Sequence, residues 1–269
     1  CMSEHSSRAT TARAPLQRAL QQVVIPDLVR RRAAHARESA PRQVLAQEDL
    51  NRMAQASVLN AYAIETELED LLMHGWTLER VYLDAIAGTA RLLGQWWIAD
   101  QLDFASLTLA AGRLQDIVRR WESRFVKSAA PLPDAHHFQA LLLSEFNDQH
   151  SLGLLMLQSF FKRDGWCVHN TWGMQEDQAL AHVESSAVHL VGLSICTDRR
   201  LTQTRHFIQA LRQRSQNPCL QIMLGGPLVL SHPEQVEDLG ADWLAADADQ
   251  ASRDALARVA QVHQVRRMA

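Results

Sequence analysis

The chain has 269 residues, of which 47% are hydrophobic and 21% charged, and its formal net charge is -3. This composition is typical of a folded globular protein and argues against a disordered chain. The small net charge gives the whole molecule no electrostatic attraction to nucleic acid or to a membrane. Four cysteines without ligand-like spacing, no recognisable signal peptide and no apolar run of bilayer-spanning length predict a soluble cytoplasmic protein with reduced thiols and no membrane contact.

Residues 1–45 are predicted to form an Arg-rich segment with one helix. Apolar residues recur at helical spacing in PLQRALQQVVIPDLVRRRAAHA, where Pro26 is expected to kink the helix. The run Arg30-Arg31-Arg32 could touch phosphate, but a solvated helix face is favoured. Because nothing in its spacing supports base reading, direct sequence-specific DNA binding is not expected.

Residues 46–127 carry the pattern of a helical bundle. The segment TLERVYLDAIAGTARLLGQWW repeats apolar residues at helical spacing after Thr77, a good N-cap residue. A further helix is predicted to begin at Asp103 and to run through FASLTLAAGRLQDIVRRW. Residues 128–137 contain two prolines and little pattern, which indicates a linker.

Residues 138–269 change to short apolar runs that alternate with longer helical stretches. The runs are FQALLLSE, WCVHNT, VHLVGLSI and CLQIMLGG. This alternation predicts an α/β protein, in which the helical bundle is followed by a doubly wound, Rossmann-like parallel sheet. Ligands of such sheets bind beyond the carboxyl ends of the strands. The loops DQHSLG, SICTD and GGP each follow a predicted strand, so we expect them to converge on one ligand site.

These loops contain no familiar catalytic motif. No Walker-type phosphate loop is present, Gly225-Gly226 falls short of a dinucleotide fingerprint, and GLSIC has only one of the glycines that flank a nucleophilic serine. A lone histidine does not make a zinc site, which generally needs three or four protein ligands. None of these patterns supplies a candidate catalytic residue.

A large cofactor that carries its own metal needs only one protein ligand, and the spacing Asp148-x-His150 suits that demand. The carboxylate can accept the other ring N–H of the histidine, which fixes the tautomer and raises the basicity of the imidazole. Gly153 is expected to let the backbone turn closely into the next helix, and Gly225-Gly226 removes Cβ atoms where a ligand could lie against the main chain. The alternative for His150 is a purely structural turn.

The combination of these motifs resembles a known family. Asp148-x-His150-x-x-Gly153, Ser194 in LSIC and Gly225-Gly226 in LGGP resemble the cobalamin-binding domain shared by methionine synthase, corrinoid shuttle proteins and cobalamin-dependent regulators. The spacing agrees as well, because residues 154–193 give 40 intervening positions and residues 197–224 give 28.

The resemblance implies that cobalamin, in a hydroxo-, aquo- or adenosyl-form, binds base-off with its nucleotide tail inserted beside the sheet. His150 would then be the lower axial cobalt ligand, Asp148 its hydrogen-bond partner, and Ser194 a contact of the tail or of that pair. The segment LGADWLAAD, placed after the fifth strand, looks like the family's segment near the tail. The full set of implied cofactor-binding residues is Asp148, His150, Gly153, Leu154, Ser194, Thr197, Gly225, Gly226, Gly240, Ala241, Trp243 and Trp97. One departure is Cys196, which stands where the family has leucine and is expected to loosen packing beside the tail.

Within this family the chain is most similar to the AerR/PpaA antirepressors of photosynthesis gene expression. LLGQWWIADQLDFASLTLAAGRLQ resembles their bundle signature, and VVIPDLVRRRAAHAR resembles their N-terminal helix. The light-sensing regulators that begin with a helix-turn-helix domain fit less well, because no such domain is recognised here. Either Trp96 or Trp97 is expected to cover the upper corrin face and the other to lie in the core. For the upper axial position His35 is the first candidate and His74 the second, against an ordinary exposed helix histidine.

This resemblance implies a light- or redox-responsive transcriptional regulator, not an enzyme, that contacts a DNA-binding repressor of the CrtJ/PpsR type. Three alternatives stay open. A corrinoid methyl-transfer shuttle would share the bundle, the sheet and the motif. A haem-binding redox sensor could use His150 for iron but would leave Ser194 and the glycine pair without a tail to contact. A cofactor-free interaction module is disfavoured by the intact motif.

Overall fold

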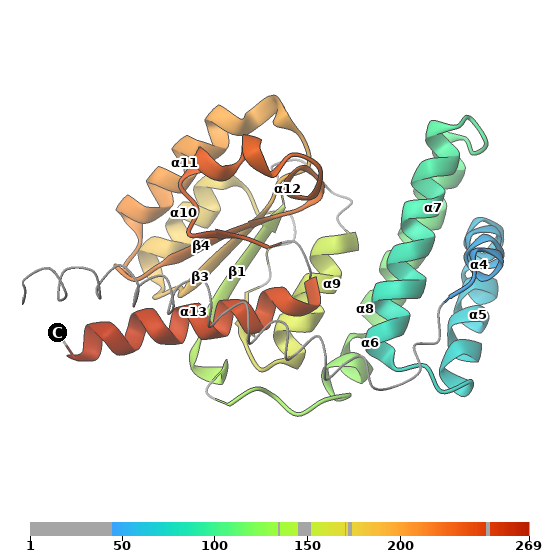
Figure 1. Cartoon of the computed structure of the whole chain (residues 1–269), viewed down its shortest axis with the longest axis horizontal. Helices are drawn as coiled ribbons and strands as arrows, with labels where there is room; N and C mark the ends of the chain where they lie inside the picture. The colour runs from blue at the N-terminus through green and yellow to red at the C-terminus, as the bar shows by residue number, and fades with distance from the viewer. Residues whose placement is uncertain are drawn as a thin grey trace, which may run out of the picture. The chain divides into compact units, whose positions relative to one another are not determined.

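The computed structural model describes residues 45–133, 135–144, 152–169, 171, 174–245 and 248–268 (Figure 1). The predicted N-terminal helix, Asp148, His150 and His35 lie outside these residues. Gln47–Ala269 belong to one compact unit, which contains a helical part and an α/β part. The predicted boundaries at 127 and 138 stay a prediction.

The helical part consists of helices that, apart from the three-residue α6, each bury part of their residues. They are α4 (Gln47–Leu59), α5 (Ala61–Met73), α6 (Leu78–Arg80), the π-helical turn η2 (Val81–Ile86), α7 (Ala87–Ile98) and α8 (Phe104–Val126). The two predicted caps are confirmed: the Thr77 side chain accepts from the backbone N–H of Arg80 at 3.3 Å, and that of Asp103 accepts from Ser106 N–H at 2.9 Å. Buried Tyr82 stacks on Phe125 of α8, with ring centroids 4.2 Å apart.

The α/β part contains a five-stranded parallel sheet with the order β2-β1-β3-β4-β5, which confirms the predicted doubly wound fold. The strands are β1 (Gln139–Ser144), β2 (Cys167–Val168), β3 (Leu190–Ser194), β4 (Gln221–Gly225) and β5 (Trp243–Leu244). The helices are α9 (Leu152–Arg163), α10 (Glu176–Ser185), α11 (Leu201–Arg214), α12 (Pro227–Ser231) and α13 (Ala248–Met268), with the short turns η3 (Ala135–His137), η4 (Asp198–Arg200), η5 (Pro233–Gln235) and η6 (Glu237–Leu239).

The central strands are covered on both faces, which explains their near-continuous apolar sequences. On one face Leu141, Val191 and Ile222 pack with residues of α10, α11 and α12. On the other face Leu142 and Met223 pack with residues of α9 and α13. Successive side chains of a strand point to opposite faces, so each strand divides its residues between the two cores.

The segment LGADWLAAD differs from its predicted position. It does not follow the fifth strand but contains it, because β5 is Trp243–Leu244. A two-residue edge strand gives too short an alternating pattern for its ends to be located from sequence.

Candidate functional site

Three strands end in register at the carboxyl edge of the sheet. Ser144 of β1 pairs with Ser194 of β3, and Ser194 pairs with Gly225 of β4. The helix α9 begins at Leu152, directly after the DQHS residues of the predicted motif. The structure therefore places the Ser194 loop and the Gly-Gly loop beside the end of the strand that leads into the Asp-x-His motif.

The side chains of Ser144 and Ser194 point toward the layer of α9 and α13, and Gly225 occupies the same face of the sheet. Two positions earlier in each strand lie Leu142, Gly192 and Met223, which are themselves in register. Leu142 and Met223 belong to the core formed with α9 and α13, and side chains two apart share a face. The row at the edge thus carries only two hydroxymethyl groups and a hydrogen atom, so this end of the layer has little side-chain volume.

Gly226 brings the main chain close to Ser194. Its φ of +98° lies in the left-handed region, and a Cβ built there would lie 2.7 Å from Ser194 Oγ and from the Ile195 carbonyl oxygen. Only glycine fits this position. A Cβ on Gly225 would instead make an ordinary contact, 3.4 Å from the carbonyl oxygen of Ala245. The close approach of two loops at the edge thus requires glycine at position 226 but not at position 225.

Trp243 offers an unused donor on the same face of the sheet. The side chain is buried among residues of the α9/α13 core, with the Arg258 guanidinium 5.1 Å from the ring centroid. Its Nε1 has no hydrogen-bond partner among the described residues. A buried N–H without a partner costs free energy, so this atom suits a ligand that brings an acceptor into the layer.

The structure does not bring Gly240 and Ala241 to this edge. Both precede β5, and Ala241 packs against the opposite core, that of α10, α11 and α12. Gly240 has a φ of +94° and ends the short helix η6, while its carbonyl oxygen accepts from Arg212 at 2.9 Å. These contacts explain both residues as turn residues.

The remaining predicted residues are dispersed. Leu154 is partly buried against the α9/α13 core, whereas Thr197 is exposed at the start of η4. Gly153 is exposed, and a Cβ there meets nothing within 4 Å, so these contacts give no steric reason for glycine.

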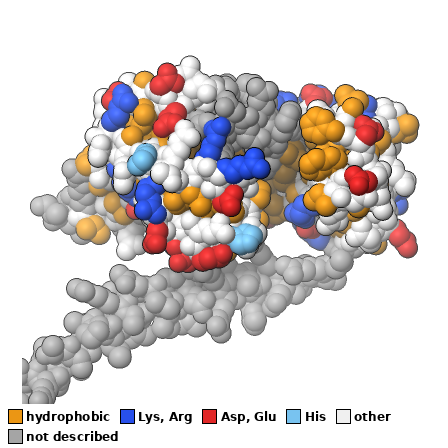
Figure 2. Space-filling view, turned by 90° about the horizontal axis from the view of Figure 1, so that it is seen from above, with side chains coloured by type: hydrophobic (Ala, Val, Ile, Leu, Met, Phe, Trp, Pro, Cys, Tyr) orange, Lys and Arg blue, Asp and Glu red, His pale blue; other side chains and the backbone are white. Residues whose placement is uncertain are grey.

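Of the two tryptophans of α7, Trp96 is half-buried and Trp97 is 46% exposed, so neither lies in the buried core. His74 is exposed at the end of α5, where its Nδ1 lies 2.8 Å from the Asp70 carbonyl oxygen. Trp97 belongs to a set of exposed large hydrophobic residues of the helical part, and Figure 2 shows hydrophobic side chains gathered there. The set is Leu59, Tyr62, Met73, Trp97, Ile98, Phe104 and Leu109.

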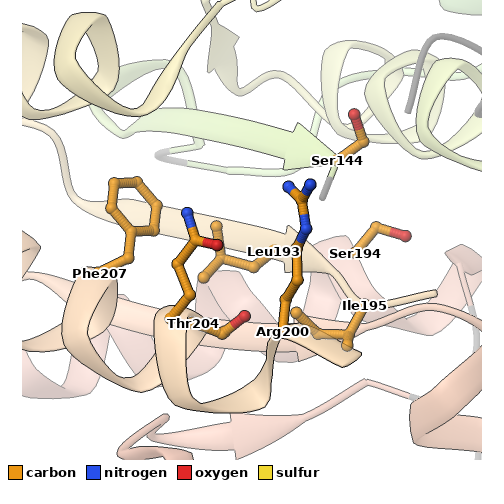
Figure 3. Close-up of a pocket in the computed structure, with 8 residues that line it drawn as sticks. Ser144, Leu193, Ser194, Ile195, Arg200, Thr204 and Phe207 are labelled. Carbon is orange, nitrogen blue, oxygen red and sulfur yellow. The ribbon is translucent and has the colours of Figure 1, made fainter. Parts of the chain in front are cut away.

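Sequence reasoning missed Arg200, which lines a small pocket at the carboxyl edge (Figure 3). The cavity of about 10 Å³ is bounded by Ser144, Ser194 and Arg200 among others, and its floor includes Leu193 and Phe207. The signal in the sequence was the pair Arg199-Arg200 directly after SICTD, at the start of a predicted helix. By itself this pair does not indicate a site, because a charged pair at the surface is usually solvated.

Histidines also gather at the other end of the sheet. The rings of His189 and His263 lie 4.9 Å apart, and burial, with a smaller contribution from His263, lowers the pKa of His189 to about 4. Burial, together with the charge of His182, lowers the pKa of His169 as well. Among the residues that the structure describes, no three His, Cys, Asp or Glu side chains are grouped to hold a metal ion.

Within the part of the chain that the structure describes, no helix has the length and apolar character to cross a membrane.

Residues 139–256 match the family model described as the B12 binding domain. A 20.5 kDa protein from the bchF-crtJ intergenic region of Rhodobacter capsulatus is 21% identical over 170 residues, which cover 63% of this chain and 87% of that protein. The monomethylamine corrinoid protein of Methanosarcina barkeri is similar in structure, with a TM-score of 0.65 and 14% identity over 78% of this chain and 98% of that one. At this identity the likeness shows the fold alone.

Proposed function

We propose that this chain, which carries a B12-binding domain at residues 139–256 and takes cobalamin as its cofactor, is a transcriptional regulator that acts through a protein partner. The corrinoid would bind base-off, with His150 as the lower axial ligand and Asp148 accepting from its other ring nitrogen. The observation that carries the cofactor assignment is the family match over the segment in which Ser194 and Gly225-Gly226 stand in register at one edge.

The described residues fit a cobalamin tail on the α9/α13 side of the sheet. Ser194 and Gly225 face that layer at its open end, and Gly226 can carry no side chain that would block the edge. Trp243 Nε1 supplies a buried donor without a partner among the described residues. When bound, the corrinoid supplies a cobalt whose upper ligand can change with light or redox state. The protein's own contribution is to hold the imidazole, receive the tail and exclude water from the layer.

The regulatory part of the proposal rests on two supports. One is the relative from the bchF-crtJ region, whose chain is covered almost completely. The other is the exposed apolar set of the helical part, because contiguous exposed apolar surface commonly marks a contact with another macromolecule. The partner we propose is a DNA-binding repressor of the CrtJ/PpsR type. The role is regulatory rather than catalytic, since a change of cobalt ligand can shift a conformational equilibrium without turnover.

The cofactor assignment is tested by absorption spectroscopy. The purified protein is incubated with hydroxocobalamin, desalted, and measured in the dark and after illumination. We expect a retained corrinoid spectrum in the wild type, and a shifted or lost spectrum in His150→Ala. His74→Ala is the matched control, because that histidine is exposed at the end of α5, and it should bind like the wild type. A wild type that retains no corrinoid in either condition would overturn the assignment.

The regulatory assignment needs a different assay. A repressor of the stated type is bound to its DNA site, and the protein is added with and without cobalamin. We expect a cobalamin-dependent change in the repressor's DNA affinity that His150→Ala does not produce. Transfer of a methyl group from a methyl donor to the bound corrinoid, with no effect on the repressor, would instead identify a methyl shuttle.

A further inference from the structure

The side chain of Arg200 lies at the mouth of the site described above. Figure 3 shows it rising past Leu193 toward the ends of β1 and β3, where Ser144 and Ser194 lie. Both serines point toward the α9/α13 layer, whereas Leu193 belongs to the opposite core. Arg200 therefore spans the end of the sheet and brings a cation to the two hydroxyl groups.

The position of Arg200 in its own helix is unfavourable for a cation. Arg200 is the N-cap of the 14-residue helix α11, and its side chain makes no capping hydrogen bond. The N-terminal end of a helix carries a partial positive charge, which favours an anion and disfavours Arg or Lys. Local choices that break such a rule are expected at functional sites. The first turn of α11 and the guanidinium together make this corner attractive to an anion.

The cofactor supplies one anionic group of suitable chemistry. In cobalamin the nucleotide tail is joined to the corrin side chain through a phosphodiester, while the other corrin side chains are neutral amides. A guanidinium binds phosphate oxygens through two parallel N–H donors, and serine hydroxyls donate single hydrogen bonds to the same kind of acceptor. The pocket itself lies on the α11 side, because Leu193 and Phe207 belong to the core of α10, α11 and α12. Its two serines stand at the strand ends and face the layer that the tail would enter, so Arg200 reaches that layer only across the edge of the sheet.

We propose that Arg200, with the hydroxyl groups of Ser144 and Ser194, binds the phosphodiester of the cobalamin tail. The cavity of about 10 Å³ holds no more than one water-sized sphere, so the phosphate lies at its mouth, outside the strand ends. This inference rests on the proposed function. It adds a residue that selects complete cobalamin over corrinoids that lack the nucleotide.

The test compares two ligands and three variants of the full chain. Dissociation constants are measured for hydroxocobalamin and for cobinamide, which lacks the nucleotide and its phosphodiester. Arg200→Gln should weaken cobalamin binding about 10- to 100-fold and leave cobinamide binding unchanged, because hydrogen bonds to a charged group are lost for only one ligand. Arg200→Lys should recover part of the loss. Arg199→Gln is the matched control, because Arg199 is the exposed neighbour in the same turn, and it should change either constant by less than about threefold.

Two results would contradict the contact between Arg200 and the phosphodiester. Equal losses for both ligands would show that Arg200 supports the protein rather than the phosphate, and unchanged constants would show no contact; either result overturns the inference. Circular dichroism of each variant identifies a folding defect, in which case Arg200→Lys alone decides by its cobalamin-to-cobinamide ratio. Failure of the proposed function has a separate signature, since the wild type would then bind neither corrinoid.

Discussion

At the residue scale, Gly226 is the position at the edge that tolerates no side chain. An added methyl group would combine a left-handed backbone with contacts of 2.7 Å to the Ile195 carbonyl oxygen and to Ser194 Oγ. We predict that Gly226→Ala lowers the free energy of unfolding by at least about 2 kcal/mol and weakens corrinoid binding. Urea denaturation measures the first effect and absorption after desalting the second.

The matched control for this prediction is Gly94→Ala in the middle of α7. Nothing lies within 4 Å of the added methyl group there, and the backbone is helical. This variant should be about 0.5–1 kcal/mol more stable than the wild type, because glycine is unfavourable inside a helix. Equal stability changes in both variants would contradict the steric argument at Gly226.

His189 determines part of the pH dependence of stability. Burial, with His263 adding a smaller effect, holds its pKa at about 4 against an ordinary value of 6.5, so the folded protein keeps the ring neutral. The unfolded chain binds a proton below about pH 6.5 and the folded chain only below about pH 4, so the stabilising contribution is complete above 6.5 and is lost as the pH falls to 4. A difference of about 2.5 pKa units corresponds to roughly 3 kcal/mol as an upper value.

We therefore predict that His189→Asn flattens the pH dependence of unfolding. The new side-chain oxygen can still accept from the Gln139 N–H, which His189 Nδ1 now accepts at 3.1 Å, but it does not titrate. Urea denaturation is carried out between pH 4 and pH 8, and the slope of the free energy of unfolding against pH gives the number of protons bound on unfolding. Between about pH 4 and pH 6.5 this number should be lower by about one in the variant than in the wild type. An unchanged slope would assign the titration to other groups.

At the element scale, α9 joins the cofactor edge to the helical part. Its first residue, Leu152, follows the Asp-x-His motif in the sequence, and its last residue, Arg163, is only 2% exposed. The Arg163 guanidinium packs against the rings of Phe125 and Phe160, 5.0 and 4.7 Å from their centroids, and donates to Glu79 Oε2 at 2.8 Å. Residues of two separate helices of the helical part thus hold the end of α9.

A second carboxylate completes this buried junction. Arg163 Nε donates to Asp164 Oδ1 at 3.2 Å, and the hydroxyl of Ser252 in α13 donates to Asp164 Oδ2. All three residues are buried. Removing the guanidinium would leave the Asp164 carboxylate buried without its cation, which is far more costly than losing an exposed ion pair.

We predict that Arg163→Met lowers the free energy of unfolding by about 3 kcal/mol. The matched control is Arg124→Met on α8, whose partner Glu69 lies 2.6 Å away with both side chains more than 40% exposed. That exposed pair should contribute less than about 1 kcal/mol. Guanidinium chloride denaturation of both variants checks the contrast, and similar losses would show that burial is not what strengthens the Arg163 junction.

At the scale of the whole molecule, the two parts are expected to unfold together. Gln47–Ala269 form one compact unit, and α8 meets α9 through Lys162–Glu122 at 2.7 Å as well as through Arg163. We predict one cooperative thermal transition whose midpoint rises with hydroxocobalamin concentration, equivalent to about 2.7 kcal/mol at 100 times the dissociation constant. Calorimetry would show two transitions, with only one responding to the ligand, if the parts were independent domains.

Much of the architecture follows from sequence patterns that act locally. The caps at Thr77 and Asp103 were predictable because a capping side chain and the N–H groups it satisfies are neighbours along the chain. The strands β1, β3 and β4 were predictable because strands covered on both faces read as apolar runs. The short strand β5 was misplaced because two residues carry no usable alternation.

Some features of the candidate site were likewise predictable from the sequence, and others were visible only in the tertiary structure. The sequence by itself determined the cobalamin-binding domain, the parallel sheet and the meeting of the Ser194 and Gly225-Gly226 loops, since the order of strands and loops dictates which ends share an edge. Only the tertiary structure decided that Ala241 belongs to the opposite core, that Trp243 has an unused buried donor, and that Arg200 reaches the edge. Those facts depend on the face of the sheet to which a side chain points and on its neighbours from distant parts of the sequence. The local sequence pattern predicts neither of them.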